Sequence, residues 1–161
     1  MLRPIGYLCL TLAMLGCVST QSQVVFEPGV VDGPKVIALS GPRHPWTVEI
    51  EKLLRSRGYE IKRFASTTRA TELTSPGRVE SYNQSSARVV LHVDGFAPNT
   101  SMTRCFGGGY KFSYIIAEII DTARNVSLAT YSNSGYSENC PPLSGTIFRD
   151  IADMVDAVFS S

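Results

Sequence analysis

Two cysteines, Cys105 and Cys140, enclose the stretch of this sequence that most limits its fold. Between them lie three consecutive glycines, a long run of strand-forming residues over 110–121, a short turn, and a second such run over 126–132. Two runs of β-branched and aromatic residues on either side of a turn are typical of a β-hairpin. We therefore expect a hairpin held at its open end by a disulfide bond, with the rest of the chain packed around it.

The first strand of this hairpin alternates along its length. Regular alternation predicts two faces, one with Ile115, Ala117 and Ile119 and the other with Tyr110, Phe112, Tyr114 and Ile116. Because both faces are partly apolar, we expect a central strand. Asp121, at its end, is expected to stabilise the turn.

The N-terminus has the pattern of a secretory signal. Arg3 precedes an apolar run over 5–15, and Gly16 stands immediately before Cys17. The segment Leu15-Gly16-Cys17 resembles a bacterial lipobox, which implies that Cys17 becomes the lipidated first residue. Met14 and Leu15 differ from the usual leucine followed by a small residue, so ordinary secretion is the alternative. The resemblance also implies an outer-membrane address, because Val18, and not aspartate, follows the cysteine.

This N-terminus accounts for the four cysteines of the chain. Cys9 leaves with the signal and Cys17 carries lipid, so Cys105 and Cys140 remain as a pair in an oxidising compartment. A metal pair or a redox thiol is the alternative, but no C-x-x-C motif or neighbouring ligand favours it. We expect a signal peptide over 1–16, a lipidated N-terminus and tether over 17–34, and a single domain over 35–161.

Hydrophobic periodicity predicts the remaining elements. Strands are expected over 35–40, 59–64 and 88–94, and residues 23–26 can add an edge strand. Apolar residues at helical spacing predict helices over 44–57 and 146–159, the second capped by Ser144 or Thr146. Residues 65–87 show no readable pattern. The order β-α-β-(?)-β-β-β-α predicts an α+β fold, with a mixed sheet of about four to five strands and two helices packed on one face.

Composition excludes several classes of function. The chain has a formal net charge of +1, which gives it little electrostatic attraction for nucleic acid. Its two histidines do not form a metal site, although His92 and Asp94 are expected to share one face of a strand. No nucleophile elbow is present, and a strand, not a helix, follows the glycine triplet 107–109. We expect no catalytic residues, no metal and no cofactor.

The loop that ends at Cys140 is the strongest candidate for a contact surface. Tyrosine, serine and asparagine combine rigid contact area with adaptable hydrogen bonding. Together with the segment next to Cys105, it provides the predicted binding residues Phe106, Tyr131, Asn133, Tyr136 and Glu138. The alternative is a loop that the disulfide holds for stability alone.

The order of elements is similar to the α/β domain shared by the N-terminal part of TolB, the curli-assembly lipoprotein CsgG and the penicillin-binding-protein activator LpoB. The residues that carry this resemblance are KVIALS over 35–40, Glu51-Lys52-Leu53-Leu54, and YIIAEIID over 114–121. The resemblance implies an accessory protein of the cell envelope and brings no catalytic residues. The Cys105 and Cys140 pair departs from that group.

These observations predict a non-enzymatic, lipid-anchored cell-envelope protein that binds or assembles with a protein partner. Its expected location is the periplasmic face of the outer membrane, held there by N-terminal lipid, with an envelope protein or a second copy as partner. The alternative is a binder of a small molecule, a lipid or a glycan such as peptidoglycan, in a pocket between the sheet and the helices. A hydrolase would need an assembled set of catalytic residues, which the sequence does not offer.

Overall fold

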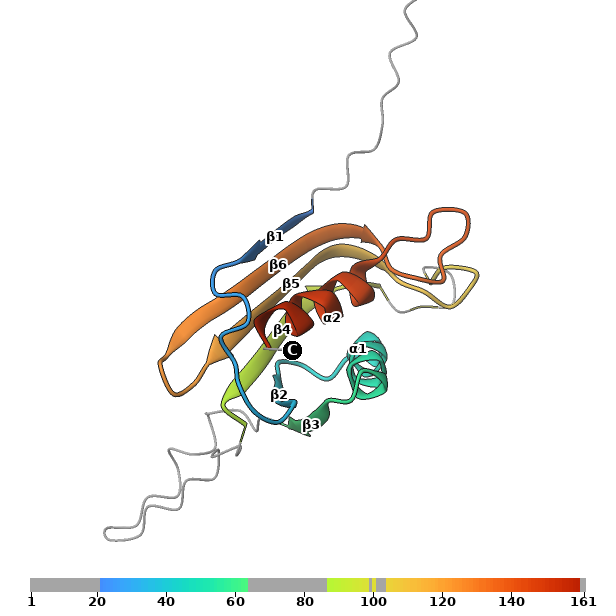
Figure 1. Ribbon diagram of the computed structural model, residues 1–161. Coiled ribbons are helices and arrows are strands. Elements are labelled where there is room, and N and C mark those ends of the chain that lie inside the picture. The colour runs from blue at the N-terminus through green and yellow to red at the C-terminus, as the bar shows by residue number, and fades with distance from the viewer. Residues whose placement is uncertain (1–20, 64–86, 99, 101–103, 160–161) are drawn as a thin grey trace, which may run out of the picture.

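The computed structural model describes residues 21–63, 87–98, 100 and 104–159, which form one mixed β-sheet with two helices (Figure 1). The strands are β1 Ser22–Val25, β2 Val36–Ser40, β3 Glu60–Arg63, β4 Val89–Phe96, β5 Lys111–Asp121 and β6 Val126–Tyr136, and the helices are α1 Pro45–Ser56 and α2 Ile147–Val158.

The predicted α+β class is confirmed. The sheet has six strands, in the order β1-β6-β5-β4-β2-β3, and not the predicted four to five. The unassigned segment 65–87 lies outside the described residues, except for Ala87.

The sheet combines two patterns of connection. β2 pairs in parallel with both β3 and β4, and α1 connects β2 to β3. β4, β5, β6 and β1 pair antiparallel, so the predicted hairpin is confirmed as β5 and β6, with β6 reaching Tyr136. Within the described part of the chain, no helix is long and apolar enough to span a membrane.

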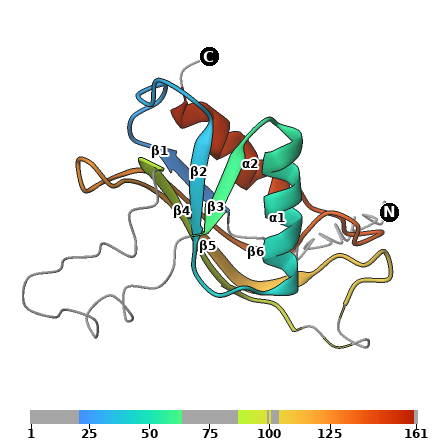
Figure 2. The ribbon, with the colours of Figure 1, turned by 90° about the horizontal axis from the view of Figure 1, so that it is seen from below.

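Both helices cover the same face of the sheet (Figure 2). α1 presents Trp46, Ile50 and Leu54 at helical spacing, and all three are buried. The helix begins at Pro45, whose fixed φ suits a first turn, and Gly58 follows its end with φ +89°. α2 buries a wider apolar stripe, which includes Ile151, Val155 and Val158.

Aromatic rings join the two helices to the sheet. The ring of Phe112 on β5 contacts Trp46 of α1 edge-on, with centroids 5.3 Å apart, and Phe148 of α2 in the same manner at 6.0 Å. Edge-to-face pairs stabilise by about 0.5–1.5 kcal/mol beyond the area that they bury. Phe112 is therefore the point at which both helices and the sheet meet.

The predicted alternation of β5 is wrong at its beginning. The pairing with β6 shifts register between Phe112 and Ile115, and this irregularity changes which residues share a face. Phe112 lies in the core with Ile115, whereas Tyr114 and Ile116 are exposed on the opposite face. β5 is central in the sheet, but its second face is partly open to solvent.

The described part of the expected tether belongs to the folded domain. β1 pairs with β6, which confirms an edge strand near 23–26. Farther along, Gly29 N–H donates to the carbonyl of Ala157, and Val31 is buried and bridges Phe159. Residues 22–31 therefore pack along the sheet edge and α2, within the range 17–34 that the sequence predicts as a tether.

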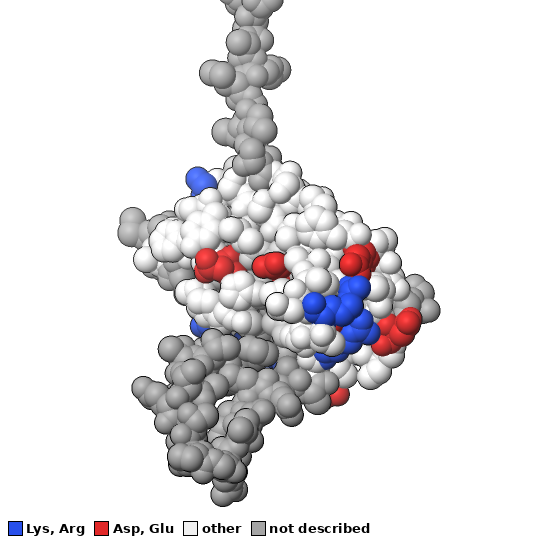
Figure 3. Space-filling view, turned by 90° about the vertical axis from the view of Figure 1, so that its left-hand side faces the viewer, with Lys and Arg blue, Asp and Glu red and all other residues white. Residues whose placement is uncertain are grey.

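A buried aspartate organises the turn between β5 and β6. The Asp121 side chain is fully buried and accepts hydrogen bonds from Arg88 Nη2 at 2.6 Å and Arg124 Nε at 3.1 Å. It also accepts from the backbone N–H of Ala123 and Arg124, which confirms the expected turn role. The Arg88 hydrogen bonds hold the pKa of Asp121 at about 2, below its usual 3.8. Figure 3, which faces this side of the molecule, shows basic side chains gathered with acidic ones beside them.

Candidate binding site at the disulfide-linked end of the sheet

The predicted disulfide between Cys105 and Cys140 is confirmed, with Cα atoms 4.9 Å apart. It joins the loop that precedes β5 to the loop that follows β6. Cys105 N–H donates to the carbonyl of Gly109, and Gly109 N–H donates to the carbonyl of Asn139. Covalent and backbone bonds together hold the two loops as one unit, which we call the linked loops, residues 104–109 and 137–146.

The close approach of these loops explains the glycine triplet. A Cβ on Gly109 would lie 2.1 Å from the carbonyl oxygen of Glu138, and one on Gly107 would lie 2.5 Å from that of Asn139. Real Cβ atoms do not approach oxygen so closely, so glycine is required at both positions for steric reasons. The triplet therefore serves loop packing.

The linked loops expose two large apolar side chains. Phe106 is fully exposed, at 102% of its reference surface, and Leu143 is 58% exposed. Nearby, Arg104 lies with its guanidinium 4.5 Å from the ring centre of Tyr110. A large aromatic side chain that is fully exposed on a fixed loop is available for burial by a partner.

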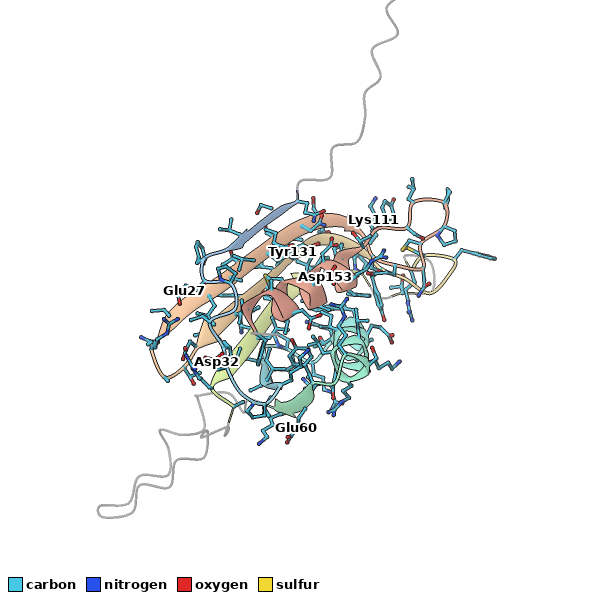
Figure 4. All side chains as sticks on the ribbon, viewed as in Figure 1. Glu27, Asp32, Glu60, Lys111, Tyr131 and Asp153 are labelled. Carbon is cyan, nitrogen blue, oxygen red and sulfur yellow. A yellow bond between two sulfur atoms is a disulfide. The ribbon has the colours of Figure 1, made fainter. Side chains whose placement is uncertain are left out.

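A cavity of about 670 Å³ lies beside the linked loops, between the ends of β1, β5 and β6. Its wall includes Gln21, Lys111, Asn133, Tyr136, Leu143 and Thr146. Its size falls within the range of about 300–1,000 Å³ that is usual for small-ligand sites. In Figure 4, Lys111 marks the end of the sheet at which β5 begins. Gly145 closes the wall, because its N–H bonds the carbonyl of Ser137 and a Cβ would lie 2.0 Å from the carbonyl oxygen of Tyr136.

A chain of hydrogen bonds sets the orientation of one amide in this wall. Asp150 Oδ2 accepts from Thr146 Oγ1 at 2.8 Å, from Gln21 Nε2 at 3.2 Å and from the Tyr131 hydroxyl at 3.3 Å. Burial raises the pKa of the Tyr131 hydroxyl, so it keeps the single proton that it donates to Asp150. Its oxygen must then accept the 2.7 Å hydrogen bond from Asn133 Nδ2. Asn133 Oδ1 is left buried, with no hydrogen-bond partner among the described residues.

The structure brings together only part of the predicted contact surface. Asn133 and Tyr136 line the cavity, and Phe106 lies on the linked loops. Tyr131 is 1% exposed, so its prediction as a contact residue is wrong: it faces the core opposite Ala117 and below α2.

Glu138 has a structural contact that its sequence context did not reveal. Its carboxylate accepts from the backbone N–H of Phe148 at 3.2 Å and of Arg149 at 2.8 Å. A carboxylate at these amides satisfies free donors at the start of α2 and complements the helix dipole. Thr146 is at the N-cap position, but its side chain bonds Asp150, so Glu138 performs the capping expected of Ser144 or Thr146.

Sequence reasoning missed Gln21, Lys111, Leu143 and Asp150 as parts of this site. Lys111 and Tyr136 are register partners on β5 and β6, and the Lys111 ammonium lies 5.4 Å from the Tyr136 ring centre. An extension of the predicted hairpin to the full length of β6 would have paired them. No local signal connects Gln21 or Asp150 to the cavity, because they come from opposite ends of the chain.

The other polar candidates have contacts on the open face of the sheet. His92 Nδ1 lies 3.2 Å from Ser40 Oγ, and the Tyr114 hydroxyl donates to Asp94 at 3.4 Å. Over the described ranges, no group of three or more histidine, cysteine, aspartate or glutamate side chains is arranged to hold a metal ion.

Comparisons with known proteins give only a distant likeness. No family model and no curated protein matches the chain. Among solved structures, it is similar to the PelC dodecamer from Paraburkholderia phytofirmans, with a TM-score of 0.47 and 16% identity over 89% of this chain and 99% of that chain. A point variant of that dodecamer, in another crystal form, gives a TM-score of 0.46 and 16% identity, over 89% and 98% of the two chains. Both neighbours are named PelC, and neither is TolB, CsgG or LpoB. A likeness of this size carries no conclusion about function.

Proposed function

We propose that this protein is a non-enzymatic, lipid-anchored protein of the cell envelope that binds another envelope protein through its linked loops. The observation that carries the proposal is the fully exposed ring of Phe106 on a loop closed by the Cys105–Cys140 disulfide. Buried aromatic side chains supply much of the binding energy at protein interfaces. A loop that is already fixed loses little conformational entropy when a partner covers it.

The expected lipid anchor at Cys17 supports a partner at the membrane. Gln21, which lines the cavity next to the linked loops, follows Cys17 by only a few positions. An extended chain spans at most about 3.6 Å per residue, so this link reaches about 14 Å. A short link favours partners that lie in or on the same membrane.

Lipid attachment can be tested directly. Cells that express the full chain and receive an alkyne-bearing fatty acid should yield labelled protein, and Cys17→Ser should remove the label. Label that persists in Cys17→Ser, or is absent from the unchanged chain, would remove the anchor from the proposal.

The protein contact can be tested by site-specific photo-cross-linking in the native host. A benzoylphenylalanine at position 106 should give a discrete cross-linked protein, identified by mass spectrometry. The same residue at position 126 is the matched control, because Val126 is 37% exposed and lies at the opposite end of the hairpin. A product with two copies of this chain would indicate self-association. No product at 106, or equal products at both positions, would contradict binding through the linked loops.

A further inference from the structure

The two edges of the six-stranded sheet differ in how they are protected. Unpaired backbone groups on an edge strand can pair with another chain, and proteins usually prevent this with charged side chains or proline. β3 forms one edge and carries Glu60, Lys62 and Arg63 in a strand of four residues. β1 forms the other edge, and its sequence Ser-Gln-Val-Val contains neither a charge nor a proline. From this contrast we infer that β1 is a dimer interface, at which it pairs antiparallel with β1 of a second copy of this chain.

The backbone of β1 shows which groups are available for such a contact. Immediately after β1, the N–H of Phe26 donates to the carbonyl of Leu128, which marks a hydrogen-bonded pair with β6. In an antiparallel ladder such pairs recur at every second residue, so Val24 also directs its backbone groups toward β6. The N–H and C=O groups of Gln23 and Val25 therefore point outward, and no other described strand lies on that side (Figure 1).

One register satisfies all four of these outward groups. With a two-fold axis at Val24, Gln23 lies opposite Val25 of the second copy, and Val25 lies opposite Gln23. Each of these pairs can exchange two hydrogen bonds, and the two Val24 residues meet at a non-hydrogen-bonded position, where side chains are closer. An axis at Gln23 or at Val25 would place only that residue opposite an outward residue of β1. The strand is therefore complementary to itself, as a two-fold interface requires.

The side chains beside this edge suit contact with an identical strand. Val24 is 47% exposed and Phe26 is 56% exposed, and neither belongs to the hydrophobic core. Apolar pairs directly across two strands stabilise a sheet, whereas like charges in that position destabilise it. Because β1 has no charged side chain, the symmetric pairing brings its two Val24 side chains together without opposing like charges.

The strength of this contact rests on the proposed lipid anchor. A pair of four-residue strands is small beside the roughly 1,200 Å² of stable interfaces in solution. Lipid at Cys17 would confine both copies to one surface and raise their effective concentration. The two-fold axis stands perpendicular to the sheet, so both N-terminal links begin at the same height above a membrane that lies parallel to the sheet.

Disulfide trapping at position 24 tests the dimer, with the full chain in the membranes of its native host. Val24→Cys places two thiols at a non-hydrogen-bonded pair, whose Cα separation of about 4.5 Å permits a disulfide. We expect most of the protein to run as a dimer on a non-reducing gel and as a monomer after reduction.

Two cysteine variants are the controls, and both should remain monomeric. Val126→Cys controls for exposure, because Val126 is 37% exposed and lies at the turn between β5 and β6. Gln23→Cys controls for the register. Its two copies would be offset by two residues along the strands, which places their Cα atoms beyond the limit of about 7 Å for a disulfide.

A proline at the same edge tests the backbone pairing. Gln23→Pro removes an outward N–H and leaves the hydrogen bonds to β6, because proline is tolerated on an edge strand where its nitrogen faces solvent. Added to Val24→Cys, it should abolish the disulfide dimer, whereas Gln23→Ala should preserve it. Equal thermal midpoints of the two variants would show that the fold is intact. If the proline variant unfolds, the comparison of positions 24, 23 and 126 decides the question alone.

Three results would overturn the inference: no dimer of Val24→Cys, equal dimer yields at position 24 and either control position, or a disulfide to a different protein. The proposed function fails separately, because its photo-cross-link at Phe106 is on the linked loops and not on β1. Fatty-acid labelling reports the anchor by itself. A disulfide dimer without label would keep the interface and remove the anchor.

Discussion

Replacement of Asp121 by asparagine isolates the charge of a buried carboxylate at the hairpin turn. Asparagine keeps an oxygen for the backbone N–H groups of Ala123 and Arg124, but it directs an amide N–H toward Arg88 in place of an acceptor. The variant should therefore retain the turn and lose the ion pairs. We expect a lower free energy of unfolding at pH 7.

The pKa of Asp121 sets the magnitude. It falls from 3.8 to about 2 in the folded protein, and a difference of this size corresponds to about 2 kcal/mol. Because the arginines are 42% and 40% exposed, solvent screens the pairs, and we expect about 1–2 kcal/mol. The pKa is lowered on folding, so this stability is present above about pH 4 and is lost as the pH falls toward 2.

Urea unfolding followed by the fluorescence of Trp46, the single tryptophan of the chain, measures the effect. Trp46 is 1% exposed and should report unfolding strongly. The difference between the unchanged protein and Asp121→Asn should shrink between pH 5 and pH 2. Asp94→Asn is the matched control, because Asp94 bonds only the Tyr114 hydroxyl among the described residues. A difference that stays constant over this pH range would refute an origin in the carboxylate charge.

Three further predictions concern stability. Replacing Cys105 and Cys140 by serine opens a loop with a sequence separation of 35, and should lower the free energy of unfolding in urea titrations by about 3–4 kcal/mol. If the unchanged protein gave the same titration with and without reductant, this prediction would be contradicted. Gly145→Ala places a Cβ 2.0 Å from the Tyr136 carbonyl oxygen, so it should lower the midpoint temperature of thermal unfolding by several degrees. An unchanged midpoint would show that the loop moves aside without cost and would contradict this prediction. Arg57→Met removes ion pairs at 2.6 Å to two aspartates of α2, and we expect a loss of about 1 kcal/mol that disappears in high salt.

Local patterns were sufficient for most of the secondary structure. Helical spacing at Trp46, Ile50 and Leu54 marked α1, because burial on one face requires that spacing whatever lies opposite. The hairpin and its disulfide were also predictable, because the turn at Asp121 and the two remaining cysteines are signals that need no partner from distant sequence.

The faces of the strands were less predictable. Strict alternation placed Tyr114 with Phe112, but the register shift between Phe112 and Ile115 moved it to the open face. A register shift arises from how two strands meet, and neither strand shows it alone. Tyr131 was predicted at the surface because its segment is polar, yet the register places it opposite Ala117 in the core.

The sequence by itself determined the elements of this protein, its signal-like N-terminus and its cysteine pair, since these depend on the order and spacing of neighbouring residues. Only the tertiary structure decided that β1 completes a six-stranded sheet and that Gln21, Lys111, Asn133 and Thr146 surround one cavity. It also decided that Asn133 keeps an unpaired oxygen, because the hydrogen bonds that orient its amide come through Tyr131 from Asp150 on α2. Residues so distant in the chain meet only when the sheet and helices pack, which is why the candidate site could not be found from local patterns.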